Sequence, residues 1–158
     1  VGEDGHQRGG ERASKTLALH RHIYDAAPQA RCVLHTHSPH LVALSLQGVW
    51  AEHDILPPIT PYQVMKVGHV PHVAYRVPGD PTVAHEVAGL IARAEQPLRA
   101  VMLERLGPVV WHQGPAQAMA LLEELEETAR LWLLCSPRPA PLSDARIDEL
   151  RQRFGAPW

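Results

Sequence analysis

The chain has 158 residues, 45% of which are hydrophobic, and a formal net charge of −2. This length and apolar content suit one domain with one substantial core. Acidic and basic residues are interspersed, so the sequence shows no basic stripe for nucleic acid, no polybasic patch for a membrane surface and no apolar run of membrane-spanning length.

Two cysteines, Cys32 and Cys135, are too few for a disulfide framework and do not form a Cys-x-x-Cys pair. Reduced thiols in a cytoplasmic protein are the simplest interpretation. The chain opens on Val1 instead of methionine and continues with a polar, glycine-rich segment. We therefore expect one domain, residues 1–158, that lacks its N-terminal part.

The first predicted helix begins near Ser14 or Thr16, either of which is a suitable cap. Residues 31–37 predict a buried strand. Ser38 then serves as the predicted N-cap of an apolar helix, with proline at its first position. This order places the end of the strand directly before a helix N-terminus.

Downstream, six prolines from residue 56 to residue 81 limit the chain to turns, a short helix near residues 62–67 and a strand around residues 70–75. The remaining predicted elements are helix 81–94, strands 99–103 and 108–111, helix 116–135 and a last helix after Ser143. The alternation of helices and strands predicts the α/β class, with a central sheet covered on both faces.

Four glutamates lie close together in the longest predicted helix: Glu123, Glu124, Glu126 and Glu127. Four acids in five residues repel one another too strongly to be buried together. We expect a solvated or intersubunit face here rather than a group of catalytic carboxylates.

The sequence His35-Thr36-His37 stands at the carboxyl end of the strand predicted over residues 31–37. Alternate side chains of a strand share one face, so the two imidazoles would project together and could share one divalent metal. Two ligands are half of a metal site. The alternative is that both are ordinary histidines among the 11 in the chain.

Several motifs occur in a characteristic order. They are Ser-Lys at 14–15, His-Thr-His-Ser-Pro-His at 35–40, Leu-Pro-Pro-Ile-Thr-Pro-Tyr at 56–62, Pro-Gly-Asp-Pro at 78–81 and Gly-Pro-Val-Val at 107–110. In this order they resemble the class II aldolase/adducin family. The segment from Leu56 to Gly68 looks most like the family's branch of 3-oxo-tetronate 4-phosphate decarboxylases.

The resemblance implies a three-layer α/β/α sandwich around a central, mainly antiparallel sheet, assembled as a homotetramer with the active site where subunits meet. It also implies a lyase that decarboxylates or cleaves a phosphorylated sugar acid with a divalent metal, commonly Zn²⁺. Breaking the carbon–carbon bond leaves a carbanion, whose charge a Lewis-acid metal spreads onto oxygen.

The resemblance also assigns roles to individual residues. His35 and His37 would be metal ligands. Ser14 and Lys15 would lie near the substrate phosphate, and Tyr62 would donate a proton from an adjacent subunit.

Two positions depart from the family pattern. Leu106 stands where the third metal histidine is expected, and Thr16 stands where an acid/base glutamate is expected. Leucine cannot ligate a metal, and a threonine hydroxyl has no pKa near neutrality. Arg105 would place a cation near the metal position, which disfavours a bound dication. The family's upstream Gly-Asn phosphate-binding loop is not found in this sequence, so it either lies outside the fragment or has been lost.

Three hypotheses remain open from the sequence. The first is a working metal-dependent lyase with an unidentified third ligand. Four other histidines are candidates for that ligand, and the alternative for each is an ordinary surface or packing histidine: His40, His69, His72 and His112. The second is a catalytically silent relative that serves assembly or ligand binding. The third is a divergent enzyme that uses Arg105 and Lys15 to bind an anionic substrate without a metal.

Overall fold

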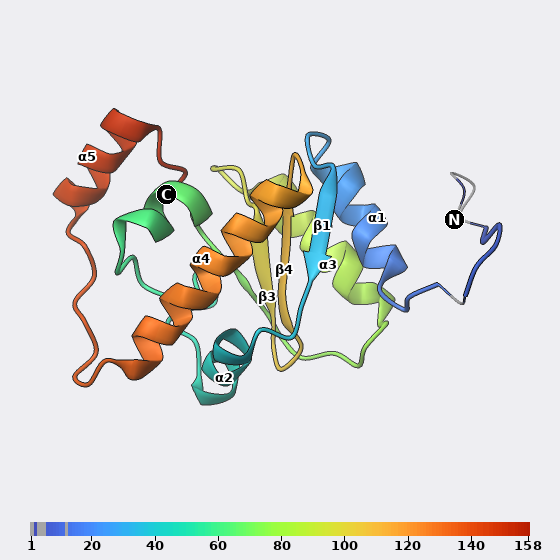
Figure 1. Cartoon of the computed structure of the whole chain (residues 1–158), viewed down its shortest axis with the longest axis horizontal. Coiled ribbons are helices and arrows are strands. Elements are labelled where there is room, and N and C mark those ends of the chain that lie inside the picture. The colour runs from blue at the N-terminus through green and yellow to red at the C-terminus, as the bar shows by residue number, and fades with distance from the viewer. Residues whose placement is uncertain (1, 3–5, 12) are drawn as a thin grey trace.

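The computed structural model describes residues 2, 6–11 and 13–158. Its elements in chain order are α1 (Leu17–Ala26), β1 (Cys32–His35), α2 (Pro39–Gln47), the π-helix η1 (Gln63–Val67), β2 (His72–Val73), α3 (Pro81–Arg93), β3 (Ala100–Leu103), β4 (Gly107–His112), α4 (Pro115–Leu134) and α5 (Asp144–Phe154). Figure 1 shows α4 running diagonally across the sheet, with α5 at the far end of the molecule from α1.

Within the described residues, four strands form one sheet in the order β1-β4-β3-β2. The β1–β4 and β3–β4 pairs are antiparallel, and the short β2–β3 pair is parallel. The prediction of a central, mainly antiparallel sheet is therefore confirmed.

Alternating side chains of the strands divide the core into two layers. In β3, Val101 packs with residues of α1 and α3, whereas Met102 packs with residues of α2 and α4. Val109 and Val110 of β4 divide in the same way. Because successive strand residues point to opposite faces, the sheet is covered on both sides, as the three-layer α/β/α prediction requires.

Two predicted strands are longer than the observed ones. The strand predicted over residues 31–37 ends at His35, so His37 lies just beyond it. The strand predicted around residues 70–75 is reduced to His72–Val73. Pro71 has no N–H to contribute to a ladder, which shortens the pairing there.

The N-terminus of α2 is capped by a distant residue. The backbone N–H groups of His40 and Leu41 donate to the Glu126 carboxylate over 2.9 and 3.1 Å. Ser38 occupies the N-cap position but makes no capping bond, because its hydroxyl bonds Thr36 instead. Glu126 therefore departs from the predicted solvated face and fixes the helix that follows the histidine strand.

A third, smaller core lies where α5 packs beside η1. It contains Val64, Ile147, Ala156 and Trp158. In the part of the chain that the structure describes, none of the helices combines the length and the apolar character needed to span a bilayer.

Candidate active site

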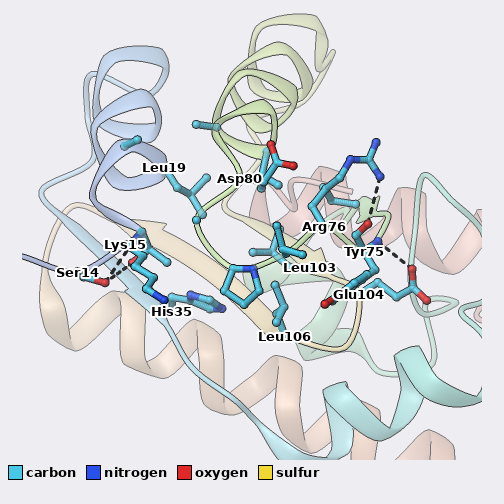
Figure 2. Close-up of a pocket in the computed structure, with 18 of the residues that line it drawn as sticks. Ser14, Lys15, Leu19, His35, Tyr75, Arg76, Asp80, Leu103, Glu104 and Leu106 are labelled. Atoms are coloured by element: carbon cyan, nitrogen blue, oxygen red, sulfur yellow. Dashed lines mark hydrogen bonds between the residues drawn. The ribbon is translucent and has the colours of Figure 1, made fainter.

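A cavity of about 490 Å³ opens beside the end of β1. It is bounded by the segment that leads into α1, the β3–β4 turn and the loop before α3 (Figure 2). Its polar and charged lining residues are Ser14, Lys15, Thr16, His20, His35, His37, Tyr75, Arg76, Asp80 and Glu104. The structure thus brings together the predicted site residues Ser14, Lys15, His35 and His37.

The two histidines lie side by side, with ring centroids 5.7 Å apart and ring planes at 70°. His35 is paired with Val109 in the β1–β4 ladder. Because Val33 packs toward α1 and α3, the alternation of the strand places His35 on the same face, where the cavity lies. His37 reaches the same cavity from the loop beyond the strand.

His35 has the electrostatic character of a neutral imidazole. Burial lowers its pKa from the ordinary value, and the neighbouring His37 and His20 add to this effect, while a hydrogen bond with the Leu106 backbone opposes it. Its Nε2 atom is buried and has no hydrogen-bond partner among the residues that the structure describes. A neutral imidazole with one free ring nitrogen is the form that ligates a metal.

Ser14 and Lys15 stand at the entrance to α1. The Ser14 hydroxyl bonds the Thr16 hydroxyl over 2.8 Å and accepts the Thr16 N–H over 3.3 Å. Gly79 lies so close that a Cβ there would be 3.2 Å from the Lys15 Cβ. Figure 2 shows Ser14, Lys15 and His35 on one side of the cavity.

Tyr75, Arg76 and Glu104 lie across the cavity from Lys15 (Figure 2). The Tyr75 N–H donates to Glu104 Oε2 over 2.9 Å, which is the main reason that the pKa of Glu104 lies below its ordinary value. Arg76 Nη1 donates to the Tyr75 carbonyl oxygen over 3.2 Å. This side of the cavity therefore carries one ionised carboxylate and one guanidinium.

Asp80 is the N-cap of α3, and its Oδ1 accepts the Thr82 N–H over 2.8 Å. A hydrogen bond from the Thr82 side chain is the largest of the effects that lower its pKa. Asp80 is therefore ionised, with one of its oxygens already engaged in capping the helix.

Leu106 lines the cavity beside the two histidines. Among the described residues, no group of three His, Cys, Asp or Glu side chains is arranged to hold a metal ion. The four histidines weighed as third ligands, His40, His69, His72 and His112, are described in full and lie outside the cavity lining. His35 and His37 thus form two parts of a metal site that the described residues do not complete.

Arg105, expected near the metal position, and Tyr62, expected to donate a proton, do not line this cavity. Arg105 lies outside the cavity lining, and its Nε is 3.5 Å from Glu104 Oε1. Tyr62 also lies outside this cavity; its ring is half exposed, with Lys66 Nζ 4.9 Å from the ring centroid.

Sequence reasoning did not single out His20, Arg76 or Glu104 as site residues. His20 lies four residues after Thr16, and this helical spacing is a signal that could have placed it on the same face. Arg76 and Glu104 come from distant segments, so no local pattern connects them.

The model of the family described as the class II aldolase and adducin N-terminal domain matches residues 1–133. This chain belongs to the class II aldolase and adducin family. A 3-oxo-tetronate 4-phosphate decarboxylase of Cupriavidus necator is 53% identical over 163 aligned positions, which cover 100% of this chain and 73% of that protein. The protein of the same name in Escherichia coli K12 is 39% identical, over 96% of this chain and 70% of its own length.

Solved structures share the fold of this chain. YgbL from Escherichia coli superposes with a TM-score of 0.84 at 37% identity, over 94% of this chain and 70% of that chain. An L-fuculose 1-phosphate aldolase superposes with a TM-score of 0.75 at 20% identity, over 93% of this chain and 66% of the other. The second likeness shows the fold alone.

Proposed function

We propose that this chain is a carbon–carbon lyase that decarboxylates or cleaves a phosphorylated sugar acid of the 3-oxo-tetronate 4-phosphate type. The observation that carries the proposal is the 53% identity to a decarboxylase of that name over the whole chain. The cavity of about 490 Å³ supports it, because its lining includes the proposed site residues Ser14, Lys15, His35 and His37. We also propose that the protein is cytoplasmic and assembles as a homotetramer, as the family resemblance implies.

Ser14 and Lys15 are the proposed phosphate contacts. An ammonium and a hydroxyl at the mouth of a cavity supply charge-assisted and neutral hydrogen bonds to phosphate oxygens. Arg76 lies across the cavity and adds a second cation that suits the carboxylate of a sugar acid (Figure 2). The substrate would then span the cavity, with its phosphate at Lys15 and its carboxylate at Arg76.

His35 and His37 are the proposed positions at which the divalent metal expected for the family, Zn²⁺, would be held if a third ligand completed the site. Their adjacent imidazoles, with ring centroids 5.7 Å apart, suit such an ion. The described residues supply no third ligand, so the present set does not fit a complete protein-held site.

Tyr62 is the proposed proton donor to a neighbouring subunit. Its exposed ring, outside the cavity of its own chain, is accessible to a partner. A phenol is a reasonable acid for a carbanion product when it is held close to the reacting carbon.

An assay of carbon dioxide release from 3-oxo-tetronate 4-phosphate, with and without added Zn²⁺, tests the proposal. Lys15→Gln should weaken substrate binding by about 10- to 100-fold, because it removes a charged hydrogen bond. The matched control is Arg146→Gln, which removes an exposed cation that pairs with Glu149 on α5. An absence of turnover with every metal tried would contradict the lyase function.

A catalytically silent binding protein is the second candidate. It is favoured by Leu106 and Thr16, since both line the cavity at the positions where the resemblance places a third ligand and an acid/base group. A silent protein would bind a phosphorylated sugar acid in calorimetry without consuming it. Loss of a measurable lyase activity in His35→Ala would exclude this alternative.

A further inference from the structure

The β3–β4 turn is fixed against the end of the histidine strand. A Cβ on Gly107 would lie 2.0 Å from the Thr36 carbonyl oxygen, so the two backbones touch. The Arg105 N–H donates to Ser45 Oγ over 3.0 Å, which ties the same turn to α2. The side chain at position 106 is therefore held at a defined place relative to His35.

His35 has an unused coordinating atom. Within the described part of the chain, its Nε2 is buried without a hydrogen-bond partner, and the ring is hydrogen-bonded to the backbone of Leu106. A buried polar atom without a partner is costly, so it marks a position where a ligand or ion would be stabilised. The half-buried leucine at position 106 offers no such partner.

The two carboxylates that line the cavity, Glu104 and Asp80, do not replace the missing third metal ligand, because both already accept hydrogen bonds. Glu104 accepts the Tyr75 N–H, and Asp80 accepts the N–H and hydroxyl of Thr82. His20 also has a buried Nε2 without a partner, but within the described residues it does not join His35 and His37 in a metal-binding group.

We infer that Leu106 leaves this chain with an incomplete metal centre, and that position 106 alone decides whether His35 and His37 can hold a divalent cation. The inference rests on the proposed placement of the metal at these two histidines. An imidazole at position 106 would enter the cavity that both histidines line and would complete a set of three nitrogen ligands, as catalytic zinc sites use.

The experiment is a titration of chelator-treated, untagged protein with Zn²⁺ by calorimetry, together with the metal content measured by elemental mass spectrometry and the visible absorption of Co²⁺-loaded samples. Leu106→His should bind one Zn²⁺ per chain, with a Kd at least about 100-fold lower than that of the unmodified chain. An outer-shell partner contributes about 10- to 100-fold to metal affinity, so a direct ligand should contribute at least as much. The unmodified chain should retain substoichiometric metal.

Three further variants complete the design. Leu106→Gln is the matched control, because it adds a polar group of similar size that is a poor zinc ligand, and it should gain no affinity. The double variant His35→Ala, Leu106→His should bind Zn²⁺ no more tightly than the unmodified chain. Leu106→Cys supplies a smaller zinc ligand and should also raise affinity, so the test does not depend on histidine fitting the turn.

Stoichiometric, tight Zn²⁺ binding by the unmodified chain would overturn the inference, because another ligand would then complete the site. Folded Leu106→His and Leu106→Cys proteins that both fail to gain affinity would also overturn it. The readout needs no substrate, so it is independent of the lyase proposal. A variant that gains metal without turnover would support the inference and count against the proposed function.

Discussion

Gly107 lies against Thr36 so closely that a Cβ on Gly107 would be 2.0 Å from the Thr36 carbonyl oxygen. The same glycine has a φ of +116°, a conformation that side chains disfavour. This contact joins the turn that carries Leu106 to the segment that carries His35 and His37. The geometry of the candidate active site therefore depends on a residue that has no side chain.

Gly107→Ala should destabilise the fold by about 3 kcal/mol or more, because it adds a backbone clash to a left-handed backbone penalty. Urea denaturation measures the change. Gly48→Ala is a matched control: its φ is +105°, but no atom of the described residues lies within 4 Å of a Cβ at that position. It should cost only about 1–2 kcal/mol. Equal losses in the two variants would contradict the clash.

Arg105 is a non-glycine residue at a φ of +64°, where glycine and asparagine are better tolerated. Arg105→Asn should raise the free energy of unfolding by about 0.5–1 kcal/mol. Its backbone bond to Ser45 is retained, and an exposed ion pair with Glu104 contributes little. Arg105→Ala removes the same side chain without relieving the backbone and should give no gain. A similar gain in both variants would refute the argument.

Glu126→Ala should lower the free energy of unfolding by about 1–3 kcal/mol, since it leaves two N–H groups of α2 and the His40 ring without their partner. Thermal unfolding measures the effect. Glu127→Ala is the control on the next residue, because Glu127 makes an exposed pair with Arg130. That change should stay within about 0.5 kcal/mol. The prediction fails if the two variants unfold alike.

His112 should make stability depend on pH. Burial, with the nearby Arg99, lowers its pKa, and its Nδ1 accepts the Gln113 N–H. The unfolded chain takes up a proton near pH 6.5, whereas the folded chain does so only at lower pH, so stability falls as pH falls below about 6.5. His112→Gln should reduce this dependence between pH 7.5 and 5.5 in urea titrations. If the free energy of unfolding changed by the same amount between pH 7.5 and 5.5 in the variant as in the unmodified chain, His112 would not contribute to the pH dependence.

The sequence determined the layers and the order of the elements. In a strand such as residues 100–103, successive side chains face opposite helical layers, because the extended backbone alone sets a period of two residues. Caps set by local chemistry were also predictable: Asp80 caps α3 through a bond to Thr82, two residues away. The closeness of the His35 and His37 rings was predictable for the same reason, because the two residues are only two positions apart in the chain.

Only the tertiary structure decided what surrounds those histidines. Glu126 caps α2 across 86 residues, and Arg76 and Glu104 reach the cavity from segments with no shared pattern. The sequence shows a leucine at position 106, but its place beside His35 follows from the packing of a turn against a strand end. Local periodicity is encoded by neighbouring residues, whereas these contacts depend on how distant segments pack, which no short pattern in the chain records.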